Sequence, residues 1–465
     1  MTEKILFLTG KLAERQLRRV LAEMPALEFD WEVRQLGVTV AALMTADMIK
    51  RRLTDLGGAS SILIPGRCQG DLAQLSAHFA VPVQRGPDEL IDLPRYFGKE
   101  GKIPDLSNYD VRIFAEIVDA PRLNITQIVE RAGRCAADGA DVIDLGCLPD
   151  TPFPHLEEAV KTLKEQGYRV SVDSMVPTDL LKGSLAGADY LLSLHEESLW
   201  VLDKVTSIPV LVPSKPGDLE SLMRAMKQLD SLGRAYIADP ILDPIHFGFT
   251  ESLLRYHHLR RSFPAAEIMM GVGNLTELTE ADTMGINALI MGLVSEMGIT
   301  NILTTQVSPH CRSAIREADI ARRIMYWARQ ENSLPKMIHS GLTGLHEMRP
   351  FTHSDHQIRE LAKAVKDPSF RIQVGREGIH LYNRDGIQTH DDPFDFLPGL
   401  NVEGDTGHAF YLGVELARAE IARQLGKRYT QDQPLSWGCA TPGNASRTTA
   451  YQPVDTTLES KKEAT

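Results

Sequence analysis

Short apolar runs separated by amphipathic stretches recur along most of the chain. In the N-terminal part, apolar runs at 4–9 and 60–65 each lead into a glycine, and the segment 12–23 has helical periodicity. The turns Gly10-Lys11 and Gly66-Arg67 could hold an anion at a helix N-terminus, or could need glycine for the backbone alone. The pattern predicts a small Rossmann-like α/β domain over residues 1–105.

Beyond residue 110 the alternation becomes regular. Eight apolar runs, most of them followed by a helix-like segment, lie at 111–118, 141–145, 169–172, 190–194, 209–212, 235–238, 267–270 and 301–304. Strands that are buried on both faces have such continuous apolar runs. Eight strand–helix units over roughly 200–250 residues are typical of a (β/α)8 TIM barrel, predicted here for residues 106–330. An open doubly wound sheet is the alternative, because spacing alone does not prove closure.

The pattern changes again after residue 330. Apolar runs at 371–374 and 378–382, with a turn at 383–386, predict antiparallel strands, and a helix is expected at 412–425. These elements predict a C-terminal α+β domain over residues 331–440. The polar segment 441–465 has scarcely any large apolar residues, and we expect it to be a disordered tail.

The charge balance narrows the range of partners. The 465 residues include 50 Lys and Arg against 62 Asp and Glu, for a net charge of −12. Such a chain lacks the broad cationic field that attracts nucleic acid or an anionic membrane, so we expect neither as a partner. Five scattered cysteines without a CxxC pair, and the absence of a run of about 20 apolar residues, favour a cytoplasmic protein.

Polar residues gather where the predicted barrel strands end. Because these ends and the loops that follow share one mouth, their side chains are expected to converge. The set consists of Glu116, Asp119, Asp144, Asp173, Ser193, Lys215, Asp239 and Asn274. Several buried carboxylates at one face indicate a ligand with many N–H donors, or a metal. The alternatives are structural: Asp173 and Asn274 could cap helices, and Asp239 could serve a turn.

Five short motifs lie in order on successive predicted strands. They are 139–146 (GADVIDLG), 172–174 (VDS), 187–193 (GADYLLS), Asp239-Pro240 followed by Phe247-Gly248, and 273–277 (GNLTE). Over residues 110–325 this set resembles dihydropteroate synthases and pterin-dependent methyltransferases. The C-terminal segments 408–413, 425–427 and 431–438 look like a domain of dihydropteroate synthase-like proteins in microbes that use tetrahydromethanopterin.

The resemblance implies a transferase that joins 6-hydroxymethyl-7,8-dihydropterin diphosphate to an arylamine. The amine of that pathway is 4-(β-D-ribofuranosyl)aminobenzene 5′-phosphate, in one-carbon metabolism such as methylotrophy. The implied pterin-binding residues are Asp144, Asp173, Ser193, Asp239 and Asn274. Lys215, His310 and Arg312 would meet a phosphate, and Asp119 and Glu116 would hold Mg²⁺. No residue is assigned a catalytic role.

The chain also departs from the synthase pattern, and the departures keep other functions open. No lysine stands beside Asn274, and the usual final Arg-x-His is replaced by 304–306 (TTQ). A pterin-dependent methyltransferase and a non-catalytic pterin-binding scaffold are therefore alternatives. A homodimer, or binding to other proteins of the pathway, is open as well.

Overall fold

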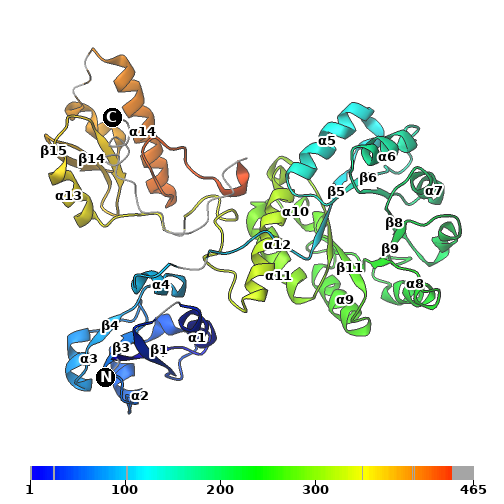
Figure 1. Ribbon diagram of the computed structural model, residues 1–465. Helices are drawn as coiled ribbons and strands as arrows, with labels where there is room; N and C mark the ends of the chain where they lie inside the picture. Colours follow the sequence, from blue (N-terminus) through cyan, green and yellow to red (C-terminus); the bar gives the residue numbers. More distant parts are fainter. Residues whose placement is uncertain are drawn as a thin grey trace. The chain divides into compact units, whose positions relative to one another are not determined.

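The computed structural model describes residues 3–24, 27–100, 103–347, 349–400, 402 and 404–441. The predicted disordered tail, apart from residue 441, lies outside the described residues. The chain divides into two compact units, Met1–Asp105 with Gln330–Met337, and Leu106–Arg329 with Ile338–Thr465 (Figure 1). The domain boundaries expected from the sequence stay predictions.

The first unit contains a four-stranded parallel sheet in the order β2-β1-β3-β4. Its strands are β1 (Glu3–Thr9), β2 (Phe29–Gln35), β3 (Ser61–Ile64) and β4 (Val83–Arg85). Its helices are α1 (Glu14–Glu23), α2 (Ala46–Arg52), α3 (Leu72–Phe79) and α4 (Leu93–Tyr96), with 3-10 turns η1 (Ala41–Leu43) and η2 (Leu90–Asp92). The predicted α/β layer is confirmed.

Both faces of this sheet are buried, because successive side chains of a strand point to opposite faces. Leu6 packs in one hydrophobic cluster with Ile49 of α2, whereas the next residue, Phe7, packs in another cluster with Leu17 of α1. Helices therefore cover both faces, which leaves the two ends of the strands as the open sides of the layer.

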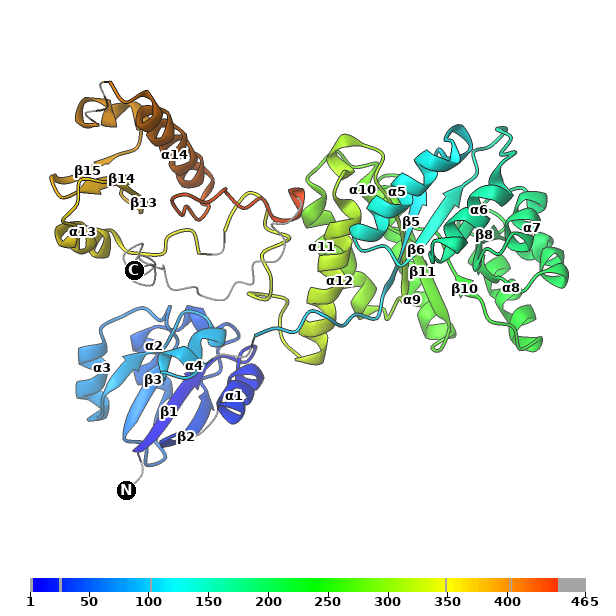
Figure 2. The same ribbon diagram turned by 45° about the horizontal axis from the view of Figure 1, so that its top comes forward.

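The second unit contains a closed barrel of eight parallel strands, which confirms the TIM barrel and excludes the open sheet (Figures 1 and 2). The strands are β5 (Arg112–Ile117), β6 (Val142–Gly146), β7 (Val170–Asp173), β8 (Tyr190–Leu194), β9 (Ile208–Leu211), β10 (Ile237–Ala238), β11 (Glu267–Gly271) and β12 (Asn301–Thr305). The main helices are α5 (Ile125–Ala137), α6 (Leu156–Glu165), α7 (Pro177–Leu185), α8 (Leu219–Ser231), α9 (Phe249–Ser262), α10 (Gly273–Thr276), α11 (Thr283–Glu296) and α12 (Ala314–Gln330). A 3-10 segment, η4 (Glu196–Lys204), links β8 to β9.

Strand register places an acidic layer above an apolar layer inside the barrel. Phe114 of β5 pairs with Val142 of β6, and both are fully buried in one cluster with Tyr190. Two residues further along the same strands, Glu116 pairs with Asp144. Residues two apart on a strand share a face. The side chains of Glu116 and Asp144 therefore point into the barrel, next to the apolar layer and nearer to the C-terminal ends of the strands.

The same unit carries a three-stranded antiparallel sheet in the order β13-β14-β15; its first two strands lie at the predicted runs, and the third was not predicted. Its elements are α13 (Asp355–Ala364), β13 (Arg371–Val374), β14 (Ile379–Asn383), β15 (Gly386–His390), η6 (Pro393–Gly399) and α14 (Thr406–Leu425). α14 begins six residues earlier than predicted, because the Asp405 side chain accepts a hydrogen bond from the backbone N–H of His408 and caps the helix. Among the described residues no helix has the length and apolar character that a membrane crossing needs.

Candidate functional site

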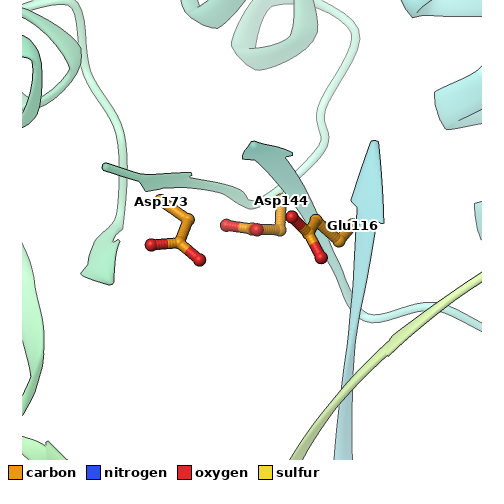
Figure 3. Close-up of side chains that lie close together, drawn as sticks. All are labelled: Glu116, Asp144 and Asp173. Carbon is orange, nitrogen blue, oxygen red and sulfur yellow. The ribbon is translucent and has the colours of Figure 1, made fainter. Parts of the chain in front are cut away.

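Three carboxyl groups meet at the carboxyl end of the barrel. Glu116 is the last residue but one of β5, Asp144 lies in β6 and Asp173 ends β7. One oxygen from each lies within 4.8 Å of the other two. Figure 3 shows Asp144 between the other two, with the three groups turned toward one another. Three adjacent strands thus deliver three acids to one small volume.

Burial and the charges of neighbouring acids raise the pKa values of this group. Burial, and then the charge of Asp173, raises the pKa of Glu116 to about 7. Burial, followed by the charges of Asp173 and Glu116, raises the pKa of Asp144 well above its ordinary value. No lysine or arginine of the described residues forms an ion pair with any of the three. The site therefore has a strong unmet demand for positive charge or hydrogen-bond donors.

Asp144 shows that demand most directly. Its carboxyl is completely buried, and its Oδ1 accepts a hydrogen bond of 2.5 Å from Ser171 Oγ. Its Oδ2 is buried without any hydrogen-bond partner. An unsatisfied buried acceptor costs roughly 1–3 kcal/mol, so a ligand that donates to this oxygen would recover that cost.

Asp173 is held by the next strand. Ser193 Oγ of β8 donates a hydrogen bond of 2.5 Å to Asp173 Oδ1. Ser193 has a φ of 70°, and the register between β8 and β9 shifts at this point, which marks a bulge. A bulge changes the direction of a side chain but requires a less favourable backbone conformation. Here it directs the hydroxyl of Ser193 toward the acid cluster.

A fourth acid, Asp239, follows β10. Its Oδ1 accepts hydrogen bonds from the backbone N–H of Ile241 at 2.8 Å and from Tyr256 Oη at 2.7 Å. Burial raises its pKa to about 6, although both hydrogen bonds act in the opposite direction. Both described hydrogen bonds are accepted by Oδ1, so Oδ2 can accept hydrogen bonds from a ligand.

Gly271, at the end of β11, leaves space beside this fourth acid. A side-chain carbon at that position would lie 4.0 Å from Asp239 Oδ2 and 3.9 Å from Asn274 Nδ2. Asn274 Nδ2 donates to the carbonyl of Leu242 at 2.9 Å, which leaves its own carbonyl oxygen as an acceptor. Asp239 and Asn274 therefore both lie next to Gly271 at the end of β11.

The loop after Asp239 is fixed in a strained conformation. Ile241 has a φ of 64°, which is rare for a β-branched residue. Arg255 of α9 donates to the carbonyl of Ile241 at 3.0 Å and to Asp243 Oδ2 at 2.5 Å. The arginine offsets the strain and keeps Asp239 directed at the mouth.

The other predicted site residues do not join the acid cluster. Asp119 forms an ion pair with Arg131 and stands apart from the three-acid cluster that contains Glu116. Lys215 and Arg312 are exposed, and His310 Nε2 lies 3.2 Å from the carbonyl of Thr276. No contact among the described residues brings these three basic side chains together.

Two residues of the site were not predicted from the sequence. Ser171 precedes Asp173 by two positions on the same strand face, so strand alternation could have found it. Tyr256 lies on α9 and is fully buried against Asp239. Helical spacing alone gives no sign of which helix residue reaches a strand end, so no sequence signal pointed to it.

Comparison with known proteins gives three kinds of match. Residues 3–88 match the model of a family of unknown function, DUF6513. An uncharacterized protein of Methanocaldococcus jannaschii is 27% identical over 526 residues, covering 93% of this chain and 99% of that protein. Among solved structures, the Yersinia pestis dihydropteroate synthase with a pterine-sulfa conjugate is 17% identical, with a TM-score of 0.38, and the match covers 49% of this chain and 95% of that one. The 7,8-dihydropteroate synthase of Vibrio fischeri is 14% identical, with a TM-score of 0.38, over 50% of this chain and 96% of that one.

Proposed function

We propose that the barrel binds a pterin and acts as a transferase of the dihydropteroate synthase type. The observation that carries the proposal is a set of acceptors at one mouth, the buried Asp144 and Asp239 and the half-buried Asp173, with no ion-paired lysine or arginine among the described residues. Such a set suits a ring that presents several N–H donors side by side. The order of the pterin-family motifs along the strands supports the same ligand.

A pterin would use this set as follows. Its 2-amino group and the adjacent ring N–H are parallel donors, and one carboxylate can accept both. Asp239 suits this role, because Tyr256 and the Ile241 N–H already fix its orientation. Asp173 with Ser193, and the carbonyl oxygen of Asn274, would approach the remaining ring atoms.

The proposed reaction is a substitution at the pterin methylene. The bond from the exocyclic carbon to oxygen breaks, and diphosphate leaves with the electron pair. The amine nitrogen forms the new C–N bond and then releases a proton. Because the electron-rich ring stabilises positive charge on the methylene, the protein mainly has to hold the ring in position and neutralise the leaving group.

A divalent cation fits the acid cluster. The carboxylate of Glu116 offers an oxygen ligand, which Mg²⁺ prefers, and one of its oxygens lies within 4.8 Å of oxygens of Asp144 and Asp173. When bound, Mg²⁺ would supply charge neutralisation for the diphosphate. Asp119, which the sequence also suggested, has its carboxylate engaged by Arg131.

The finer proposal concerns the amine, which we take to be 4-(β-D-ribofuranosyl)aminobenzene 5′-phosphate in tetrahydromethanopterin biosynthesis. The C-terminal motifs support it by resemblance. The 5′-phosphate needs cationic donors, and Lys215 and Arg312 are exposed on loops after β9 and β12, with no described hydrogen bond from their side chains.

The test is incubation of the full chain with 6-hydroxymethyl-7,8-dihydropterin diphosphate, Mg²⁺ and either p-aminobenzoate or the ribosyl amine phosphate. Diphosphate release that depends on the amine, with a product of the summed mass less diphosphate, is the expected result. Asp173→Asn should abolish it. Asp203→Asn, which changes an exposed acid of η4, is the matched control and should retain it.

A second candidate is a pterin-binding protein without turnover. It is favoured by one observation: the basic side chains that would meet the phosphates, Lys215, His310 and Arg312, share no contact in the described structure. Pterin binding without diphosphate release in the same assay would select this candidate. Absence of any pterin binding would reject both.

A further inference from the structure

A cavity that is partly open to solvent lies in the N-terminal unit, at the carboxyl ends of its parallel strands. Its volume is about 250 Å³. Residues from the ends of β1 and β3, from the first turn of α1 and from the segment after β4 line it. An engineered apolar cavity of about 150 Å³ accepts benzene, so this space is large enough for one or two fused rings.

The topology of the sheet explains why a cavity forms here. The chain passes from β1 outward to β2 and then returns to β3 on the other side of β1. Connections therefore leave the carboxyl ends of β1 and β3 in opposite directions, and a crevice opens between them. In open α/β sheets, ligands bind in the crevice at this reversal point.

Two glycines shape the walls. A side-chain carbon at Gly10 would lie 2.6 Å from the backbone nitrogen of Ala41, and one at Gly66 would lie 2.6 Å from the backbone carbon of Pro87. Glycine is required at both turns because another loop passes directly against the strand end. This result favours the purely structural interpretation of the two turns, and it means that loop backbone closes the sides of the cavity.

The interior of the cavity is apolar. Phe7, Leu17 and Leu63 are buried and line it, and Met337, from the segment that follows the last barrel helix, is 7% exposed and also lines it. These side chains would bury the body of an apolar ligand and offer it no polar specificity.

The charged groups that line the cavity are two cations, Arg67 and Lys336, and two acids, Asp88 and Glu89. Glu89 accepts from Lys336 Nζ at 2.8 and 2.9 Å and from Arg67 Nη2 at 3.0 Å. One carboxylate thus holds two cations side by side. The side chains of Lys336 and Arg67 carry three and five N–H donors, which is eight in all. Their described hydrogen bonds to Glu89 number three, so N–H donors remain for a ligand. The polar end of a ligand here should therefore be an acceptor.

We propose that this cavity binds a small organic anion, with an apolar body of one or two rings among Phe7, Leu17 and Leu63 and a single carboxylate or phosphate at Arg67 and Lys336. The site is separate from the barrel mouth, and the proposal does not rest on the reaction proposed there. It assigns a ligand-binding role to the N-terminal unit.

The test uses the full chain and 6-fluoro-2-naphthoate, observed by fluorine NMR. The acid should bind, and its neutral counterpart 6-fluoro-2-(hydroxymethyl)naphthalene should bind at least about tenfold more weakly, because it lacks the charged acceptor. The double variant Arg67→Gln, Lys336→Gln should lose about the same factor. Arg51→Gln, an exposed arginine of α2 outside the cavity lining, is the matched control and should bind as the unmodified chain does.

A second variant fills the space. Ala13 lines the cavity at the start of α1, and Ala13→Trp should abolish binding of the acid, whereas Ala22→Trp on the exposed side of the same helix should not. Circular dichroism shows whether each variant is folded. Equal binding to the unmodified chain and to a folded Ala13→Trp variant, equal binding of the acid and the alcohol, or no binding at millimolar acid would each overturn the proposal. Asp239→Asn in the barrel should leave this binding unchanged, which separates the two sites.

Discussion

The carboxyl ends of parallel strands form a candidate site in both units, yet the two candidate sites have opposite chemistry. In the barrel, Glu116, Asp144 and Asp173 are acceptors without a cation. In the N-terminal unit, the strand ends carry apolar side chains, and the charged groups are already paired through Glu89. Backbone topology determines where a ligand can bind, whereas the strand-end side chains determine which ligand it is.

The two candidate sites also differ in their effect on the stability of the fold. A cluster of buried and half-buried acids destabilises the folded barrel, because each ionised carboxylate loses its solvent and is repelled by its neighbours. The exposed ion pairs around Glu89 cost the N-terminal unit little. A site that weakens its own fold is one that function has shaped, and variants should show this difference between the units.

The largest expected effect is on the pH dependence of barrel stability. The pKa of Glu116 rises from an ordinary 4.5 to about 7, which at about 1.4 kcal/mol per unit corresponds to about 3 kcal/mol. An acid whose folded pKa is raised binds more protons when folded, so its contribution to stability is present below pH 4.5 and is lost as the pH rises toward 7. As the pH rises from 4.5 to 8, the free energy of unfolding of Glu116→Gln should therefore increase by about 3 kcal/mol relative to that of the unmodified chain. Calorimetry with EDTA present measures this difference.

Glu157→Gln on α6 replaces an exposed acid of the same unit and serves as the control. Its stability relative to the unmodified chain should stay constant over the same range. A Glu116→Gln variant that behaves like this control would show that the acid cluster carries no electrostatic strain.

The second effect concerns ligand affinity at the same mouth. Asp239→Asn replaces one acceptor oxygen with a donor that faces the donors of the pterin. The expected loss of binding free energy is at least about 1.5–3 kcal/mol for a charged hydrogen bond. Calorimetric titration with 6-hydroxymethylpterin measures it, with Asp203→Asn as the control. Unchanged affinity would remove Asp239 from the pterin site.

A smaller effect, about 1 kcal/mol, is expected for Tyr256→Phe. Tyr256 donates to Asp239 and so lowers the pKa of that acid, which is nevertheless about 6. Without the hydroxyl the pKa should rise further, and pterin affinity should fall more at pH 6 than at pH 8. Tyr236→Phe removes a tyrosine–aspartate hydrogen bond at the opposite end of β10 and should leave this pH profile unchanged.

The contrast between the sites also explains what could be predicted from the sequence. Asp144 lies near the end of the apolar run 141–145 and Asp173 directly follows the run 169–172, so the strand pattern alone predicted both at the mouth. The choice between Glu116 and Asp119 required register, because Glu116 pairs with Asp144 on the inner face whereas Asp119 lies beyond the strand and binds Arg131. The N-terminal cavity depends on loop contacts distant in sequence, such as Gly66 with Pro87, and periodicity does not contain that information.

The smallest expected effect is on the stability of the N-terminal unit. Arg67 and Lys336 are each more than half exposed at 54% and 56%, and exposed ion pairs contribute about 0–1 kcal/mol. Arg67→Gln with Lys336→Gln should therefore change the free energy of unfolding by less than about 1 kcal/mol, measured by urea titration of tryptophan fluorescence. A loss well above that would mean that the pairs around Glu89 hold the fold. A small loss, beside a large loss of naphthoate binding, is the result that separates a ligand site from a structural contact.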